Sequence, residues 1–294
     1  MNTQSGLRVG EMVVHAVSDG TFVARPGYFR RALHASSRPD FFNRDGAAWL
    51  PIGCFLIRDP DGHTVLVDAG LGPDLQQLPD GMLLIGGQLL TGLTALGVSV
   101  VDISDVICTH LHSDHVGWLF DLNAEPIFPS ATIWVGQADL ELVLDDTLES
   151  APHIRQGFRR YTGTPLLRPM EPETMIMPGL TARPAPGHTP GSFLVEVSST
   201  NRRLLLLGDA ITCPIQVEET DWHSFGDMNP KQAEYTRTHL WNQLSQTDTL
   251  GIGAHFPQLQ AGRVDTMPNS GRRSASAADS HHNDEPVRRR WLSE

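Results

Sequence analysis

The sequence predicts a folded α/β protein, and three features support this prediction. The chain has 294 residues, of which 40% are hydrophobic and 19% charged, which suits one large domain or two small ones with a substantial core. From about residue 104 onward, short apolar segments typical of strands alternate with segments of helical periodicity. Several apolar segments end in a histidine or an aspartate, and ligand sites of such folds lie at strand ends.

Strand and turn signals dominate the first quarter of the chain. Residues 11–17 are predicted to form a first strand. Residues 53–58 and 64–68 are predicted to form a hairpin, because the Asp-Pro-Asp-Gly-His segment between them is typical of a turn. A short helix is expected over residues 88–96, where Gly97 ends the helical pattern.

The alternation of strand and helix begins with the strand predicted at residues 104–109. Further strands are predicted at residues 132–135, 180–184, 193–197, 203–207 and 249–253. Helices are predicted at residues 137–144 and 229–244, and Pro230 is compatible with the first turn of the second helix.

Two stretches lack this regularity. Residues 19–45 mix aromatic side chains with arginine and proline and are predicted to form a loop that covers another part of the molecule, with a simple surface excursion as the alternative. Residues 267–294 have almost no apolar periodicity and are predicted to form a disordered tail. The folded domain is therefore expected to span residues 1–266, and His281 and His282 are discounted as ligands.

Composition narrows the class of protein. Asp and Glu total 34 against 22 Lys and Arg, a formal net charge of −12, and no basic stripe suggests nucleic acid as a partner. The first residues do not resemble a signal peptide, and no apolar run approaches the roughly 18 residues that a membrane span needs. A soluble cytoplasmic protein is expected.

Cys54, Cys108 and Cys213 are predicted to be buried thiols, because their spacing fits neither a disulfide framework nor a zinc site.

The segment from His110 to His115 contains three histidines and one aspartate at the end of the apolar run 106–108. Neutral imidazole nitrogens and carboxylate oxygens are ligands that Zn²⁺ and similar metals prefer. His110, His112, Asp114 and His115 are therefore candidate ligands, with a histidine-rich surface loop as the alternative.

Three later motifs extend this candidate site. His188 lies in a turn rich in glycine and proline, while Asp209 and His255 each follow an apolar strand. Strands that end in ligand residues place them along one edge of a sheet. Seven ligands are too many for one tetrahedral zinc, and they suit two metals about 3.5–4 Å apart that share a carboxylate.

In this order, the motifs resemble those of the metallo-β-lactamase fold superfamily over roughly residues 11–262, including Asp68 in Val67-Asp68-Ala69-Gly70. The resemblance implies a four-layer αββα sandwich with the metals in a cleft at the sheet edge. It implies that His110, His112 and His188 hold one metal and that Asp114, His115 and His255 hold the second. It further implies that Asp209 bridges them and that Asp68 orients a ligand from outside the metal's immediate contacts.

Asp209 indicates the branch of the superfamily, because true β-lactamases generally lack a bridging aspartate there, whereas lactonases, glyoxalase II enzymes and phosphotriesterases have one. The compact spacing of His188, Asp209 and His255 is similar to that of acyl-homoserine lactonases and methyl parathion hydrolase. His112 stands where diiron flavoproteins have a glutamate, which favours hydrolysis over electron transfer.

The predicted activity is hydrolysis of an ester or lactone, or of a phosphotriester, by a hydroxide shared between two metals. Asp114 or Asp209 would pass a proton to the leaving oxygen. Two Zn²⁺ per chain are expected, with Fe, Mn or Co as alternatives, and a small molecule is the expected substrate; a homodimer is compatible with the sequence. A glyoxalase II-like thioesterase or a β-lactamase-like hydrolase is the alternative function, and an iron-dependent dioxygenase or a non-catalytic metal-binding protein is less favoured.

The chain departs from the lactonase pattern at two places. The active-site tyrosine that follows the bridging aspartate in those enzymes has no counterpart in Asp209-Ala210-Ile211-Thr212-Cys213, and Trp118 replaces the usual second glycine after the ligand loop. A pocket for the substrate is predicted from one threonine and five aromatic residues, with burial in the core as the alternative for the aromatic ones. These residues are Phe22, Trp118, Phe120, Thr212, Trp222 and Phe225.

Overall fold

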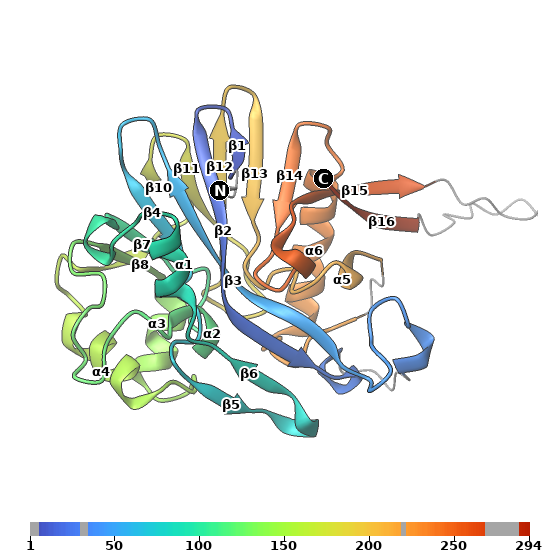
Figure 1. Ribbon diagram of the computed structural model, residues 1–294, viewed down its shortest axis with the longest axis horizontal. Helices are drawn as coiled ribbons and strands as arrows, with labels where there is room; N and C mark the ends of the chain where they lie inside the picture. The colour runs from blue at the N-terminus through green and yellow to red at the C-terminus, as the bar shows by residue number, and fades with distance from the viewer. Residues whose placement is uncertain (1–5, 30–34, 219–221, 268–287) are drawn as a thin grey trace, which may run out of the picture.

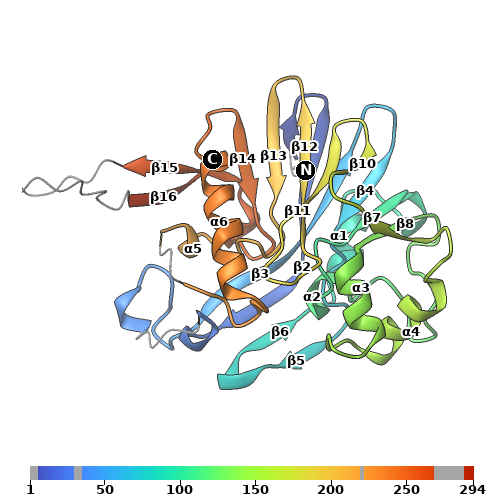
Figure 2. The ribbon, with the colours of Figure 1, turned by 180° about the vertical axis from the view of Figure 1, so that it is seen from behind.

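Two β-sheets pack face to face, and helices lie on both outer faces (Figures 1 and 2). The computed structural model describes residues 6–29, 35–218, 222–267 and 288–294, and everything below refers to these residues. This arrangement is the four-layer αββα sandwich that the sequence predicts.

The first sheet has nine strands. Its order is β5-β6-β2-β3-β4-β7-β8-β9, with β1 paired to β2, and the β4–β7, β7–β8 and β8–β9 pairs are parallel. The strands are β1 (Leu7–Val9), β2 (Met12–Ala24), β3 (Ala48–Arg58), β4 (Thr64–Val67), β5 (Leu75–Gln77), β6 (Leu83–Ile85), β7 (Asp105–Ile107), β8 (Thr132–Gly136) and β9 (Leu167–Met170).

The second sheet has seven strands in the order β10-β11-β12-β13-β14-β15-β16, and β13–β14 is a parallel pair. The strands are β10 (Thr174–Met177), β11 (Leu180–Pro184), β12 (Phe193–Ser199), β13 (Arg202–Leu206), β14 (Thr249–Ile252), β15 (Gly262–Met267) and β16 (Arg288–Ser293).

Helices α1 to α4 lie beside the first sheet and α6 runs along the second (Figures 1 and 2). Asn229 caps α6, because its side chain accepts a hydrogen bond from the backbone N–H of Gln232 (3.1 Å). The α-helices are α1 (Leu89–Ala95), α2 (Ser113–Val116), α3 (Gln137–Leu144), α4 (Pro152–Tyr161), α5 (Ile215–Glu218) and α6 (Pro230–Leu244). Short 3₁₀ helices are η1 (Pro26–Phe29), η2 (Ala35–Ser37), η3 (Pro79–Gly81), η4 (Val100–Asp102) and η5 (Pro257–Leu259).

Strand β3 shows why part of an inner strand is a continuous apolar run. Successive side chains of a strand point to opposite faces of the sheet. Cys54 and Leu56 pack into the core under the helices of the first sheet, whereas Phe55 and Ile57 pack into the core between the two sheets. Both faces of β3 are therefore buried, which gives the continuous apolar run that the sequence shows.

The structure confirms the strands and helices predicted from the sequence, with ends that differ by a few residues, and it confirms three buried, unpaired cysteines. The predicted loop at residues 19–45 is wrong at its start, because β2 continues to Ala24. After a register shift between Ser18 and Gly20, β2 keeps its pairing with β3 as far as Ala24 and Ala48. The rest of that segment contains η1 and η2, and residues 30–34 lie outside the described part of the chain.

The predicted disordered tail is also wrong at its end. Arg288–Ser293 forms β16, which pairs with β15 in antiparallel register. The Trp291 side chain is buried and packs edge-on against Phe256, with 4.9 Å between ring centroids. This aromatic contact anchors a strand whose other residues are mostly polar. Residues 268–287, with His281 and His282, lie outside the described residues.

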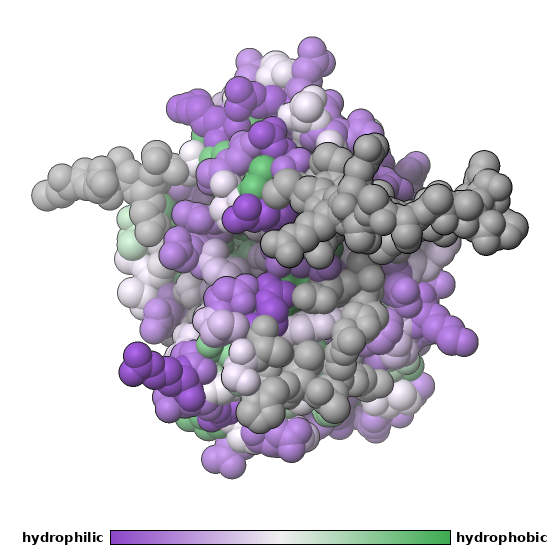
Figure 3. Space-filling model, turned by 90° about the vertical axis from the view of Figure 1, so that its right-hand side faces the viewer, coloured by the Kyte–Doolittle hydropathy of each residue, from purple (hydrophilic) through white to green (hydrophobic). Residues whose placement is uncertain are grey.

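Figure 3 shows the side of the molecule that faces right in Figure 1. Among the described residues on this face, hydrophilic side chains predominate and hydrophobic ones form small spots. Such a mixture is ordinary for a surface in contact with water. Within the described residues, no helix has the length and apolar character to cross a membrane.

Candidate metal centre

The candidate ligands come together at one edge of the two sheets because the strands that carry them end there. Strands β4 and β7 are parallel neighbours, so Asp68 and His110, which follow them, emerge side by side. Strands β13 and β14 are also parallel neighbours, and Asp209 and His255 follow their ends in the same way. The turn between β11 and β12 contributes His188. Carboxyl ends of parallel strands thus gather the site, as the sequence predicts.

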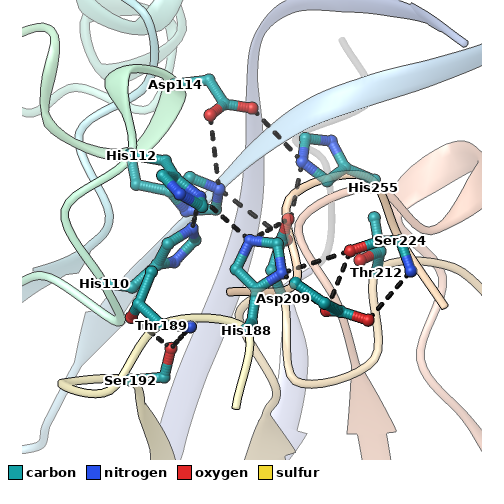
Figure 4. Close-up of polar contacts among 12 residues, drawn as sticks. His110, His112, Asp114, His188, Thr189, Ser192, Asp209, Thr212, Ser224 and His255 are labelled. Atoms are coloured by element: carbon teal, nitrogen blue, oxygen red, sulfur yellow. Dashed lines mark hydrogen bonds and ion pairs between the residues drawn. The ribbon is translucent and has the colours of Figure 1, made fainter. Parts of the chain in front are cut away.

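Three histidines form the first group of ligands (Figure 4). The Nδ1 atom of His112 lies 3.0 Å from Nε2 of His110 and 2.9 Å from Nε2 of His188. His110 and His188 are buried, whereas His112 is half-buried. Three imidazole nitrogens therefore point at a common centre, which is the arrangement that a metal with nitrogen ligands requires.

Asp114, His115 and His255 form the second group. Nε2 of His255 lies 3.3 Å from Oδ2 of Asp114, and Nε2 of His115 lies 3.8 Å from Oδ1 of Asp114. All three residues are buried. One carboxylate and two imidazoles thus converge in the way that a second metal site needs.

Asp209 lies between the two groups. Its Oδ2 is 3.5 Å from Nε2 of His188, while its Oδ1 is 3.5 Å from Nε2 of His255 and 3.7 Å from Nε2 of His115. The two oxygens of one carboxylate therefore face different groups, as a bridging ligand would.

Two atoms of this cluster are buried and have no hydrogen-bond partner among the described residues. They are Nε2 of His115 and Oδ1 of Asp209, which face each other. A buried polar atom without a partner costs about 1–3 kcal/mol, so such atoms are rare in folded proteins. A cation between them would satisfy both, and the residues present therefore fit a metal centre.

The protonation of the first group favours metal binding. Burial, together with the neighbouring imidazoles, lowers the pKa of His112 to about 3 and that of His110 well below its usual value. These two histidines are therefore neutral at physiological pH, and a neutral imidazole nitrogen is the form that binds a metal.

In the second group the carboxylate is ionised and the neighbouring histidines hold protons as long as no metal is bound. Burial opposes ionisation of Asp114, but His115 and His255 lower its pKa to about 2. Burial also disfavours the charged form of His115, but the carboxylates of Asp68 and Asp114 raise its pKa to about 9. The carboxylates thus hold protons on nearby imidazoles, and metal binding would release these protons.

The ring nitrogens that face away from the centre have fixed partners. Nδ1 of His115 donates to Oδ2 of Asp68 (2.8 Å), Nδ1 of His255 donates to the carbonyl oxygen of Pro51 (2.7 Å), and Nδ1 of His188 lies 3.1 Å from Oδ1 of Asp227. A partner of this kind fixes the ring and leaves the other nitrogen free to bind a metal. Asp68 thus contacts a candidate ligand from outside the two groups.

Gly187 allows the His188 turn to approach α6. Its φ of 133° is in a region that side-chain-bearing residues rarely adopt, and a Cβ atom there would lie 2.2 Å from the backbone nitrogen of Ala233. The turn therefore requires glycine at this position.

Sequence reasoning missed two buried carboxylates that support the site. Asp227 accepts hydrogen bonds from Ser224 and pairs with the fully buried Arg237 behind His188. Asp139 accepts from the backbone of Leu111 and Gly191, and so connects the ligand loop to the His188 turn. Both are single aspartates in ordinary helical or turn context, and the sequence around them gives no signal for contacts with residues so distant along the chain.

A cavity of about 770 Å³ opens onto the ligands. His112, Asp114, His188 and His255 form its floor. Its described walls come from β2 and η1, the segments around β5 and β6, the start of α2, the loop before α4 with the first residue of α4, and two residues before α6. They are Phe22, Tyr28, Asp74, Gln76, Gln77, Leu78, Pro79, Leu84, Ser113, Leu148, Glu149, Ser150, Ala151, Pro152, Phe225 and Gly226.

Only part of the predicted pocket lines this cavity. Phe22 and Phe225 do, whereas the prediction is wrong for four residues. Phe120 packs against Phe158 in the core, and Trp222 packs against Phe29. The indole of Trp118 donates to Asp19 (2.8 Å) and packs against the same core as Phe120, and Thr212 is fully buried away from the cavity surface. Aromatic side chains fill cores as readily as pockets, and the sequence does not distinguish the two.

Known proteins similar to this chain include lactonases. The chain is 27% identical over 172 residues to the uncharacterized protein YobT of Bacillus subtilis (strain 168), over 55% of this chain and 63% of that protein. It is 29% identical over 181 residues to the N-acyl homoserine lactonase AttM of Agrobacterium fabrum, over 55% of this chain and 66% of that protein. The chain thus matches slightly less than two thirds of the length of these relatives.

Similar solved structures have the same fold. AidC, a dizinc quorum-quenching lactonase in complex with the product N-hexnoyl-L-homoserine, superposes with a TM-score of 0.78 at 22% identity, over 98% of this chain and 96% of that one. The hydrolase AbOPH of the beta lactamase superfamily superposes with a TM-score of 0.77 at 20% identity, with the same coverage. The sequence profile of the metallo-beta-lactamase superfamily matches residues 47–245, more than half of the chain. The protein therefore belongs to the metallo-beta-lactamase superfamily.

Proposed function

We propose that this protein is a hydrolase that uses two divalent metal ions to cleave a neutral ester or lactone. The observation that carries the proposal is the position of Asp209, whose two oxygens face two separate groups of ligands and whose Oδ1 is buried without a hydrogen bond to another described residue. The similarity to N-acyl homoserine lactonases supports the same class of reaction.

His110, His112 and His188 would hold one ion, Asp114, His115 and His255 the other, and Asp209 would contact both. When bound, such ions supply Lewis acidity and lower the pKa of water from about 15.7 toward about 7. Zn²⁺ suits the mixture of imidazole and carboxylate, and Fe, Mn and Co accept the same ligands.

Asp114 is the better placed of the two predicted proton carriers. It lines the cavity, whereas Asp209 lies beneath the cavity surface. We therefore assign Asp114 the role of passing a proton to the leaving oxygen of the substrate.

The charge of the cavity wall favours a neutral substrate. Asp74 and Glu149 line the cavity together with Asp114, and the lining contains no lysine or arginine among the residues that the structure describes. Away from the proposed metal ions, an anionic group of a substrate would meet these carboxylates with no lysine or arginine among the described lining residues, and such like-charge contacts are unfavourable. A glutathione thioester or a β-lactam with its carboxylate is therefore less suited to this cavity than a neutral lactone, aryl ester or phosphotriester.

A panel of substrates tests this proposal. The metal-loaded protein is expected to hydrolyse a neutral lactone or aryl ester with a kcat/KM up to about 10-fold above that for S-lactoylglutathione or a cephalosporin, since about 1.4 kcal/mol corresponds to that factor and the two wall carboxylates are exposed to solvent. Glu149→Gln should reduce the ratio of kcat/KM between neutral and anionic substrates. The matched control Glu141→Gln, on the exposed side of α3, should leave this ratio unchanged. A preference for the anionic substrates would refute the proposal.

A further inference from the structure

Tyr28 contributes to the cavity lining from a segment far from the ligand motifs. It lies on η1, which follows the end of β2, and its side chain lines the cavity that also contains His112, His188 and His255. The residue is 6% exposed, so most of the ring is buried and little of it reaches the cavity surface.

Aromatic contacts fix the ring of Tyr28 relative to the metal centre. Tyr28 packs edge-on against Phe22 (4.9 Å between centroids, 73°) and against Phe29 (5.1 Å, 86°). Phe22 in turn packs edge-on against the candidate ligand His255 (5.5 Å, 64°). The phenol therefore has a defined position beside the second ligand group, because edge-on aromatic pairs restrict each ring.

A phenol keeps its proton at physiological pH, because its ordinary pKa is about 10. The Tyr28 hydroxyl is therefore a neutral hydrogen-bond donor.

Two other polar side chains of the cavity already make hydrogen bonds. Ser113 donates to the side-chain oxygen of Gln76 (2.8 Å), and the amide nitrogen of Gln76 donates to Asp74 (3.1 Å). No lysine or arginine lines the cavity within the described chain. Tyr28 lines the same cavity, and aromatic packing fixes its position next to the candidate ligands.

We propose that the Tyr28 hydroxyl donates a hydrogen bond to the carbonyl oxygen of the bound ester or lactone and stabilises the negative charge that develops on it. The inference rests on the proposed hydrolase function. It assigns a catalytic role to a residue outside the metal-binding motifs. This residue belongs to the segment 19–45, which the sequence predicts to be a covering loop. A donor directed at a developing oxyanion acts on kcat more than on substrate binding.

Tyr28→Phe tests this role, because it removes the hydroxyl and keeps the ring that packs on Phe22 and Phe29. We expect kcat for a neutral ester to fall about 100-fold with little change in KM, since this is the usual effect of losing one oxyanion donor. Metal content and melting temperature should equal those of the wild type. The control Tyr161→Phe removes a hydroxyl that binds the exposed Glu125 and should keep full activity.

A series of esters with different leaving groups separates this role from proton transfer to the leaving oxygen. A hydrogen bond to the carbonyl oxygen predicts the same loss of kcat for all of them. A loss that grows with the pKa of the leaving alcohol, or an unchanged kcat in a Tyr28→Phe protein with its full metal content, would overturn the inference and leave the proposed function intact. If the metal-loaded wild type hydrolyses no ester or lactone, the proposed function fails and the inference fails with it.

Discussion

Replacement of Asp209 by alanine is expected to lower the metal content from two ions per chain toward one and to reduce kcat by about 1000-fold or more. Asp209 faces both ligand groups, so its loss removes one ligand from each. Metal ions contribute several kcal/mol to the stabilisation of charge in the transition state, and each 1.36 kcal/mol corresponds to a factor of ten in rate. Elemental analysis of the purified variant and steady-state kinetics on a neutral lactone would measure both effects.

Asp248→Ala provides the control, because Asp248 is exposed on the loop before β14 and lies outside both ligand groups. This variant should keep both ions and full activity. An Asp209→Ala protein with two bound ions and wild-type kcat would refute the bridging role.

Replacement of Asp19 by alanine is expected to cost the largest amount of stability. Its fully buried carboxylate accepts hydrogen bonds from five backbone N–H groups and one indole N–H, which belong to the turn after Asp68, the start of α1 and the segment after the ligand loop. The donors are Leu71, Gly72, Gly87, Gln88, Leu89 and Trp118. Removal of the carboxylate leaves these groups buried and unpaired, so we expect the free energy of unfolding to fall by about 3–5 kcal/mol in denaturant titrations.

Asp145→Ala is the matched control for this measurement. Asp145 is an exposed aspartate whose side chain accepts from the backbone of Thr147 (2.9 Å), so its loss should cost about 1 kcal/mol or less. A free energy of unfolding for Asp19→Ala within about 1 kcal/mol of the wild type would show that the chain satisfies these donors in another way.

The positions of the candidate ligands were predictable because they depend on local sequence. Apolar segments that end in His110, Asp209 or His255 identify strands and the residues at their ends, and parallel pairing brings those ends to one edge. The glycine and proline around His188 identify a rigid turn in the same local way. The grouping of these residues then follows from the topology of the sheets.

The supporting residues depend on contacts between distant segments, and local patterns carry no information about those. Asp19 and Trp118 are 99 residues apart in the chain and lie within hydrogen-bond distance. Phe120 and Trp222 look like pocket residues in the sequence, yet they are buried, whereas Tyr28 lines the cavity. Strand β16 lies at the edge of its sheet, where polar residues are common. Its composition therefore does not indicate a strand, and its backbone pairing with the distant β15 is what makes it one.

Hydrolysis of a neutral lactone, measured as a function of the number of metal ions bound per chain, is the most direct test of the two-metal hydrolase. Protein stripped with a chelator should have no activity above background, because the chain's own residues then lack the Lewis acid. Activity should return with added Zn²⁺ and reach its maximum at two ions per chain. Activity that survives complete removal of metal, or that reaches its maximum at a single ion, would contradict the proposed two-metal centre.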